Sequence, residues 1–167
     1  MSAATVRAFV GIGSNLDDPP AQVTRALEAL ADLPGTRRVA ASRRYRNPPM
    51  GPPGQPHYVN AVAELATTLG PEPLLDALQA IEARAGRRRA GARWGPRPLD
   101  LDLLLYGDRQ LRTERLTVPH PGIATRAFVL YPLADIDPDL HLPGIGPLRE
   151  RLAAVPADGL EPLAEGQ

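Results

Sequence analysis

Residues 99–106 have the sequence Leu-Asp-Leu-Asp-Leu-Leu-Leu-Tyr, an apolar strand pattern that two carboxylates interrupt. Successive side chains of a strand point to opposite faces, so the odd-numbered leucines are expected on one face and Asp100 and Asp102 on the other. Their α-carbons would lie about 6.5–7 Å apart, so the carboxylates repel unless positive charge is near. The preceding arginines and a divalent metal ion are the candidates for that charge. The segment therefore predicts metal-dependent chemistry on a phosphorylated substrate.

The order of the remaining strand and helix patterns predicts a fold class. The main predicted elements are a strand over 5–12, a helix from about 19 to 33, strands over 37–46 and 58–68, a helix over 71–84 and a strand over 99–106. Short strands over 110–112 and 115–118 and a helix over about 125–133 are predicted to follow. This β-α-β-β-α-β order predicts an α+β, ferredoxin-like sandwich, in which helices pack on a mainly antiparallel sheet and C-terminal additions follow.

Length and composition favour one domain. A chain of 167 residues can bury a sizeable core, and no linker divides it, so residues 1–167 are expected to form a single domain. Alanine, proline and glycine are frequent beyond about residue 145, which predicts a loosely held tail. The start of the chain lacks a secretion signal and no apolar run approaches a membrane span, so a cytoplasmic protein without membrane contacts is expected. Zero net charge indicates no nucleic-acid partner, and a monomer is the expected state.

Two residue types are missing from the chain, and their absence excludes several chemistries. There is no cysteine, which excludes disulfides, thiolate catalysis and zinc–sulfur sites. All 19 basic residues are arginine. A P-loop requires its lysine, so a Walker-type nucleotide site is excluded, and so is a lysine Schiff base. Phosphate must therefore be bound by arginine, backbone N–H groups, hydroxyls or metal.

The carboxylate pair and the arginine-rich segment 84–97 each have an ordinary structural interpretation. An Asp-x-Asp strand can simply present a charged face to solvent, and an arginine-rich loop can be a solvated surface or a weak nucleic-acid patch. Together they favour a phosphate site, because arginine forks bind phosphate oxygens and carboxylates without His or Cys favour Mg²⁺ or Mn²⁺. Two such ions would lie about 3.5–4 Å apart. Trp94 either anchors this segment or stacks on a base.

Other residues indicate a site for a flat, polar heterocycle. Tyr58 and Asn60 share one face of a predicted strand that follows a proline-rich loop over 47–56. An asparagine offers both a donor and an acceptor to an amide edge, and Phe128 is a candidate for a second aromatic plane. His120 lies between two prolines, which hold it rigidly for a phosphate contact or for a role as general acid.

Several short segments over about residues 5–143 together carry a family resemblance. They are Gly11–Leu16, Tyr45–Gly51, Gln55–Pro56, Tyr58–Ala61, Ile81–Glu82, Gly86–Arg87, Arg93–Arg97, Leu99–Asp102, Leu116–Pro121 and Arg126–Leu130. In content and order they resemble the 6-hydroxymethyl-7,8-dihydropterin pyrophosphokinase family of folate biosynthesis. The resemblance implies a ferredoxin-like fold, two Mg²⁺ ions, and transfer of pyrophosphate from the co-substrate ATP to the hydroxymethyl group of the pterin, with release of AMP.

The resemblance also implies a role for individual residues. The catalytic residues implied are Arg87, Arg97, Asp100 and Asp102, of which the two aspartates hold the metal ions. The pterin-binding residues implied are Asn47, Pro48, Met50, Tyr58, Asn60, Trp94 and Phe128. The nucleotide-binding residues implied are Gln79, Glu82, Arg87, Arg89, Trp94, Arg97, Leu103, Arg115, Thr117, His120 and Arg126. Asn47 and Pro98 depart from the family pattern, in which threonine is frequent at both places. Pro98 removes a hydroxyl and an N–H beside the strand of the aspartates.

Two alternative functions stay open at this point. A nonenzymatic, ferredoxin-like RNA-binding module that uses the arginine-rich segment would carry aromatic residues in an RNP pattern on its sheet, and the sequence has no such pattern. Another magnesium-dependent Asp-x-Asp enzyme, such as a nucleotidyltransferase, would release pyrophosphate rather than AMP.

Overall fold

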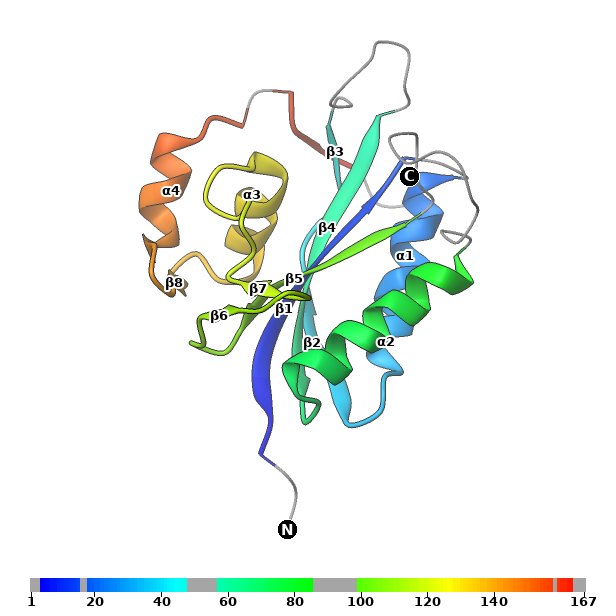
Figure 1. Ribbon diagram of the computed structural model, residues 1–167. Coiled ribbons are helices and arrows are strands. Elements are labelled where there is room, and N and C mark those ends of the chain that lie inside the picture. Colours follow the sequence, from blue (N-terminus) through cyan, green and yellow to red (C-terminus); the bar gives the residue numbers. More distant parts are fainter. Residues whose placement is uncertain (1–3, 16–17, 48–56, 86–98, 158, 164–167) are drawn as a thin grey trace.

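One six-stranded antiparallel sheet lies between two layers of helices (Figure 1). The computed structural model describes residues 4–15, 18–47, 57–85, 99–157 and 159–163. The elements within these ranges are β1 (Val6–Ser14), α1 (Pro19–Ala31), β2 (Thr36–Ala41), β3 (Tyr45–Asn47), β4 (Tyr58–Thr67), α2 (Pro71–Arg84), β5 (Asp100–Tyr106), β6 (Leu111–Arg112), β7 (Thr117–Val118), α3 (Ala127–Ile136), β8 (His141–Leu142), β9 (Gly146–Pro147), α4 (Leu148–Ala154) and β10 (Glu161–Pro162). The strand order is β10-β3-β4-β1-β5, and β2 also pairs with β4.

Strand β1 lies inside the sheet, next to the edge strand β5, and is apolar on both faces. It pairs with β4 on one side and with β5 on the other. Val10 and Ile12 belong to the core between the sheet and helices α1 and α2, whereas Phe9 belongs to the core under α3 and α4. Alternating side chains therefore supply two cores at once, which is why the strand is buried on both faces.

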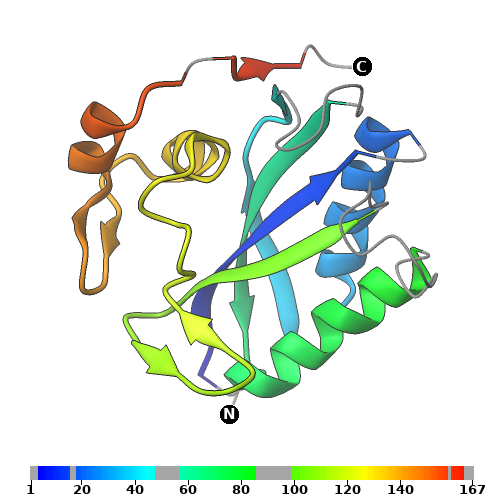
Figure 2. The same ribbon diagram turned by 45° about the horizontal axis from the view of Figure 1, so that its top comes forward.

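The helices cover the sheet in pairs, α1 and α2 on one face and α3 and α4 on the other (Figure 2). Helix α1 buries Val23, Ala26 and Leu30 at helical spacing. Helix α2 begins at Pro71, a residue whose fixed φ and missing N–H suit a first turn. The predictions of these two helices and of a mainly antiparallel α+β fold are confirmed. None of the described helices has the length and apolarity that a bilayer crossing requires.

The predicted alternation of leucines along β5 is wrong at its end, because the strand contains an irregularity. Phe9 pairs with Leu105 and Val10 pairs with Leu103, so one extra residue, Leu104, stands between them on β5. A bulge of this kind reverses the faces beyond it. Leu103 accordingly lies in the core with α1 and α2, whereas Leu105 lies in the core with α3 and α4. The face that carries Asp100 and Asp102 precedes the bulge and is as predicted.

Two other predicted elements have different bounds in the structure. The strand predicted over 37–46 is divided into β2 and β3. At the break the Ser42 N–H still donates to the Val62 carbonyl at 2.8 Å, but the Val62 N–H donates to the Ser42 hydroxyl, at 2.9 Å, instead of to a backbone carbonyl. The helix predicted over about 125–133 starts at Ala127 and continues to Ile136. Both changes affect the site, since β3 and α3 each contribute a wall of it.

The segment beyond about residue 145, which composition predicts to be loosely held, makes several contacts with the rest of the protein in its described part. Leu148, the first residue of α4, is fully buried in the core with α3. The hydroxyl of Tyr131 on α3 donates to the Val155 carbonyl at 2.8 Å, and the Leu163 N–H donates to the Arg44 carbonyl at the same distance. A few apolar anchors and backbone hydrogen bonds thus hold this segment in spite of its alanine and proline content.

Candidate active site

A pocket of about 200 Å³ opens where β1, β3, β4 and β5 meet the beginning of α3. These elements come from distant parts of the chain, and the sheet register brings them together. The residues that line the pocket are Gly11, Ile12, Gly13, Asn47, Tyr58, Asn60, Ala61, Asp100, Asp102, Leu104, Arg126, Phe128 and Val129.

The two carboxylates form one wall of this pocket. Asp100 and Asp102 lie opposite Gly13 and Gly11 in the antiparallel register of β5 with β1. Because these partners have no side chain, nothing on β1 covers the carboxylates from the neighbouring strand. The side chain of Asp102 is 50% exposed, so it is open to a ligand that enters the pocket. Gly11 and Gly13 had no predicted role in the site, and only the register shows why glycine stands there.

The amide of Asn60 lies on the floor of the pocket and is nearly buried, at 8% exposure. Its Nδ2 donates to the Ile12 carbonyl at 3.5 Å. Its Oδ1 is buried and, among the described residues, accepts no hydrogen bond. Buried polar atoms are generally paired, so this oxygen points to a ligand that brings an N–H donor into the pocket.

Two aromatic side chains reach the pocket from separate elements. Tyr58 begins β4 and pairs with Asn47 of β3, while Phe128 is in the first turn of α3. Both rings are partly exposed, as a platform for a flat ligand requires. The guanidinium of Arg126 lies 5.7 Å from the centre of the Phe128 ring, which adds a positive charge at the edge of the pocket.

His120 stands beside the carboxylate wall in a fixed orientation. Its Nδ1 accepts a hydrogen bond from the Gly122 N–H at 3.0 Å, and its Nε2 lies 3.9 Å from Oδ2 of Asp102. The neutral ring therefore carries its proton on Nε2, facing the carboxylate of Asp102. Burial lowers the pKa of His120 below its ordinary value; Asp102 raises this pKa and Arg126 lowers it. In this form the ring is a hydrogen-bond donor to an anionic ligand.

Other residues predicted to bind the nucleotide lie on the opposite side of β5. The carboxylate of Glu82 is 5% exposed and accepts the Leu101 N–H at 2.7 Å, between the two aspartates of the strand. Leu103 is buried in the core with α1 and α2. Its side chain thus points away from the pocket, and its contact with the nucleotide stays a prediction. Glu82 braces the backbone of β5 in this structure.

Arg115 and Gln79 come together on the exposed side of α2. Arg115 donates to Asp76 at 2.6 Å, to Glu72 at 2.9 Å and to the side-chain Oε1 of Gln79 at 3.4 Å. Hydrogen bonds with Asp76 and Glu72 raise the pKa of Arg115 further above its ordinary value. Thr117 lies nearby in sequence on β7, which packs beside β5.

Some of the predicted site residues line the pocket, and others lie outside the residues that the structure describes. The predicted residues that line the pocket are Asn47, Tyr58, Asn60, Asp100, Asp102, Arg126 and Phe128. The predicted residues outside the described ranges are Pro48, Met50, Arg87, Arg89, Trp94 and Arg97. Leu104 and Val129 also line the pocket. The sequence pattern did not indicate them, because apolar residues on a strand and a helix are usually core.

The donor set of the pocket fits a magnesium site that is completed by substrate. No group of three or more acidic or His side chains that could hold a metal ion is found within the described ranges. Mg²⁺ in phosphoryl-transfer sites is typically held by one or two carboxylates together with phosphate oxygens and water. Asp100 and Asp102, on one face of one strand, match that requirement.

Comparisons with known proteins agree on one family. Residues 9–138 match the family described as 7,8-dihydro-6-hydroxymethylpterin-pyrophosphokinase. The 2-amino-4-hydroxy-6-hydroxymethyldihydropteridine pyrophosphokinase of Pseudomonas aeruginosa is 55% identical over 157 residues, which cover 94% of this chain and 96% of that protein. The protein of the same name from Haemophilus influenzae is 49% identical over 138 residues, covering 83% of this chain and 86% of that protein.

Solved structures show a shared fold at low sequence identity. A structure of HPPK-DHPS in complex with substrates has a TM-score of 0.69 and 11% identity, covering 91% of this chain and 43% of that one. The wild-type HPPK-DHPS of Plasmodium falciparum with pteroate has a TM-score of 0.71 and 12% identity, covering 90% of this chain and 42% of that one. The chain therefore spans less than half the length of these structures.

Proposed function

The chain belongs to the 7,8-dihydro-6-hydroxymethylpterin-pyrophosphokinase family, and on that basis we propose that the pocket beside Asp100 and Asp102 holds the pterin at the reaction centre. The activity is transfer of pyrophosphate from ATP to the hydroxymethyl group of 6-hydroxymethyl-7,8-dihydropterin in folate biosynthesis. The products are AMP and the pterin diphosphate. The two functions left open by the sequence, an RNA-binding module and a nucleotidyltransferase, have no support from these relatives.

The observation that carries the site assignment is the combination in one pocket of Asn60, two aromatic rings and the carboxylate pair. A pterin is a flat ring with an amide-type edge that carries N–H donors and a carbonyl acceptor. The buried Oδ1 of Asn60 would accept an N–H of that edge, and its Nδ2 would turn from the weak contact with Ile12 to donate to the ring carbonyl. Tyr58 and Phe128 would cover the two ring faces. In such a pose the hydroxymethyl group would extend toward the aspartates, which line the same pocket.

Asp100 and Asp102 would hold two Mg²⁺ ions together with the phosphate oxygens of ATP. When bound, the ions would neutralise phosphate charge and lower the pKa of the attacking hydroxyl. The carboxylates themselves have one clear task, which is to fix the position of these charges on a rigid strand. Glu82 supports that task, since its hydrogen bond to Leu101 holds the strand between them.

The reaction we assign to the pocket is a direct displacement. The hydroxymethyl oxygen forms a bond to the β-phosphorus of ATP, while the bond from that phosphorus to the oxygen bridging to the α-phosphate breaks. AMP leaves with the bridging oxygen, and the hydroxyl proton passes to water. Positioning and charge neutralisation dominate such transfers. His120 would donate its Nε2–H, and Arg126 its positive charge, to phosphate oxygens at the rim of the pocket.

The remaining residue roles implied by the family resemblance complete the proposal. Arg87 and Arg97 would contact the transferring phosphates, with Arg89 and Trp94 beside the nucleotide and Pro48 and Met50 beside the pterin; all six lie outside the described residues. On the far side of β5, the pair of Arg115 and Gln79 and the hydroxyl of Thr117 would face the nucleoside.

Several coarser features belong to the same proposal. We take residues 1–167 as one domain and a monomer, working in the cytoplasm, where ATP and reduced pterins meet. The ferredoxin-like description is supported by the order of β2, β4, β1 and β5 in the sheet and by the pair α1 and α2 on one face.

Product identification tests the proposed function. The purified protein is incubated with ATP, Mg²⁺ and 6-hydroxymethyl-7,8-dihydropterin, and the nucleotides and pterins are separated and identified by mass. Equal amounts of AMP and pterin diphosphate are expected. Formation of pyrophosphate in place of AMP would indicate a nucleotidyltransferase, and a folded protein that forms neither product would refute the assignment.

A further inference from the structure

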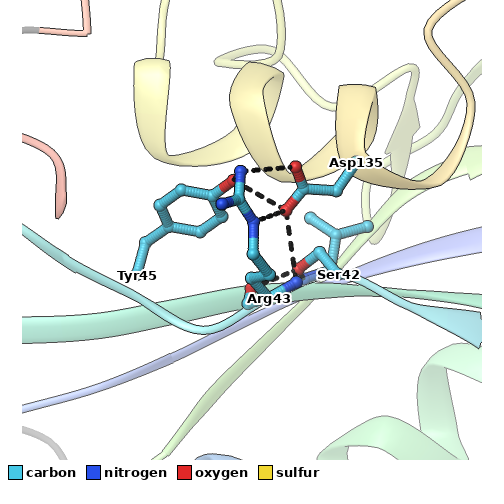
Figure 3. A network of polar contacts seen from close by, with 5 residues as sticks. Ser42, Arg43, Tyr45 and Asp135 are labelled. Carbon is cyan, nitrogen blue, oxygen red and sulfur yellow. Dashed lines mark hydrogen bonds and ion pairs between the residues drawn. The ribbon is translucent and has the colours of Figure 1, made fainter. Parts of the chain in front are cut away.

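A cluster of polar groups joins the strand β3 to the last turn of α3 (Figure 3). The hydroxyl of Tyr45 donates to Oδ2 of Asp135 at 2.6 Å. Arg43 donates from its backbone N–H and from Nε to the same oxygen, each at 3.2 Å, and from Nη2 to Oδ1 at 3.1 Å. The Arg43 Nη2 also donates to the Tyr45 hydroxyl at 2.9 Å. These contacts bridge residues that are 90 positions apart in sequence, so they fix one element against another.

Both ends of this cluster belong to elements that also line the proposed pterin pocket. In the register of β3 with β4, Tyr45 pairs with Asn60, which lines the pocket. Two residues further along β3, Asn47 pairs with Tyr58, and both of these residues line the pocket. At the other end, Asp135 and Phe128 share α3. Seven residues of helix separate them, about 10 Å along the axis. A shift of α3 relative to β3 would therefore change the gap between the Phe128 ring and the Tyr58 and Asn60 wall.

Apolar packing alone leaves such a shift poorly restrained. Helix α3 contacts the sheet through buried Val129, Leu130 and Leu133, and hydrophobic contacts of this kind are non-directional. Pro132 also removes one N–H from the helix ladder. A short hydrogen bond from a phenol to a carboxylate, in contrast, is directional and strong.

We propose that Tyr45 and Asp135 are positioning residues that set the width of the pterin pocket, by fixing α3 and its Phe128 against the strand that pairs with Asn60. This role rests on the proposed function of the pocket. Neither residue lines the pocket, so neither contacts the pterin in this arrangement.

The contacts of this cluster differ in how strongly they restrain α3, and this difference decides which variants to test. Tyr45 is 4% exposed, and the side chain of Asp135 is 18% exposed, whereas that of Arg43 is 61% exposed. An exposed ion pair contributes little, so the Tyr45–Asp135 bond carries the restraint and Arg43 adds to it. Tyr45→Phe removes only the hydroxyl and keeps the ring in place, which makes it the variant of choice.

The test measures steady-state constants for each substrate separately in the wild type, Tyr45→Phe, Asp135→Ala and the double variant. We expect each single variant to raise the KM for the pterin about tenfold, the effect of losing a hydrogen bond to a charged group. The KM for ATP should stay within about twofold of its wild-type value. The double variant should not exceed the larger single effect, because Asp135→Ala already removes the bond that Tyr45→Phe removes.

A matched control comes from the same end of α3. Asp137 forms an ion pair at 3.0 Å with Arg7 of β1, at the end of β1 away from the pocket glycines. Asp137→Ala therefore removes another tether between α3 and the sheet without touching β3, and its pterin KM should stay within about twofold of the wild type. Thermal unfolding of all variants, followed by circular dichroism, shows how far each lowers stability.

The outcomes separate this role from a merely structural one and from the proposed function. Unchanged pterin KM in Tyr45→Phe and Asp135→Ala, or equal increases for both substrates, would overturn the positioning role whatever the loss of thermal stability. An increase in Asp137→Ala equal to theirs would overturn it as well. A wild-type protein that forms no AMP would instead refute the proposed function, before any variant is compared.

Discussion

Asn60 occupies the space that a side chain at residue 13 would need. A Cβ built on Gly13 would lie 2.9 Å from Nδ2 of Asn60, closer than real Cβ contacts allow. The two residues are direct partners in the register of β1 with β4. The missing side chain of Gly13 is thus what permits the Asn60 amide to lie flat on the pocket floor.

Gly13→Ala is expected to raise the KM for the pterin about tenfold or more, because the new methyl group displaces an amide that makes hydrogen bonds to the ligand. The KM for ATP should change little. Steady-state kinetics check this expectation. Gly11→Ala adds the same methyl group at the other pocket glycine, where its Cβ would meet only the flexible side chain of Leu104, at 3.4 Å. It leaves Asn60 in place and should therefore raise the pterin KM less than Gly13→Ala does. Equal behaviour of the two variants would argue against the role given to Asn60.

Replacing Asn60 by leucine should weaken pterin binding without lowering thermal stability. The Oδ1 of Asn60 is buried and lacks a hydrogen-bond donor within the described residues, and an apolar group of similar shape removes that cost. We expect Asn60→Leu to keep or raise the midpoint of thermal unfolding while weakening pterin binding by about tenfold to a hundredfold. Calorimetry and pterin titration measure the two effects. Tight pterin binding by this variant would contradict the proposed recognition.

The pKa of Tyr45 is expected to be visible in an alkaline titration. Burial, and then the hydrogen bond to Asp135, raise this pKa from 10.0 to about 12. Because the folded-state pKa is above the unfolded one, the contribution to stability is complete below pH 10 and is lost as the pH rises toward 12. Tyrosinate absorbance of the wild type should include a late-titrating group that is absent from Tyr45→Phe. Ionisation of all tyrosines near pH 10 would show that the Tyr45 hydroxyl is not held as described.

Glu82 is expected to support both stability and turnover. Glu82→Leu leaves the Leu101 N–H without its buried acceptor, which costs about 1–3 kcal/mol of unfolding free energy. Since this N–H lies between the two aspartates of β5, turnover should fall as well. Glu82→Gln keeps an acceptor oxygen and should recover most of the loss in urea unfolding. A leucine variant as stable and active as the wild type would show that the contact is dispensable.

The fold class was predictable from the sequence because its signals are local. The apolar spacing in α1 and α2, and Pro71 at the start of α2, specify helices without reference to the rest of the chain. The faces of Asp100 and Asp102 also follow from strand periodicity alone. The bulge at Leu104 could not be predicted, since it depends on how β5 pairs with β1, and its effect is to transfer Leu105 to the other core.

Long-range polar contacts explain the other differences between prediction and structure. The bonds between Tyr45 and Asp135, and between Tyr131 and the carbonyl of Val155, join segments that no local pattern connects. They order α3 and the segment after residue 145, which composition alone marked as loosely held. The Oδ1 of Asn60 without a hydrogen-bond donor among the described residues is likewise a property of the folded pocket. That Asn60 and Tyr58 share one strand face was evident from the sequence.

The central claim is that Asp100 and Asp102 form the reaction centre, and the turnover of Asp100→Asn and Asp102→Asn tests it most directly. Each substitution keeps the shape of the side chain and removes a charge that would bind Mg²⁺. AMP formation at saturating ATP, Mg²⁺ and pterin should fall at least about a hundredfold in each variant. Thermal stability should be kept or raised, because two neighbouring carboxylates no longer repel. AMP formation near the wild-type rate in either folded variant would mean that this carboxylate belongs only to a charged strand face.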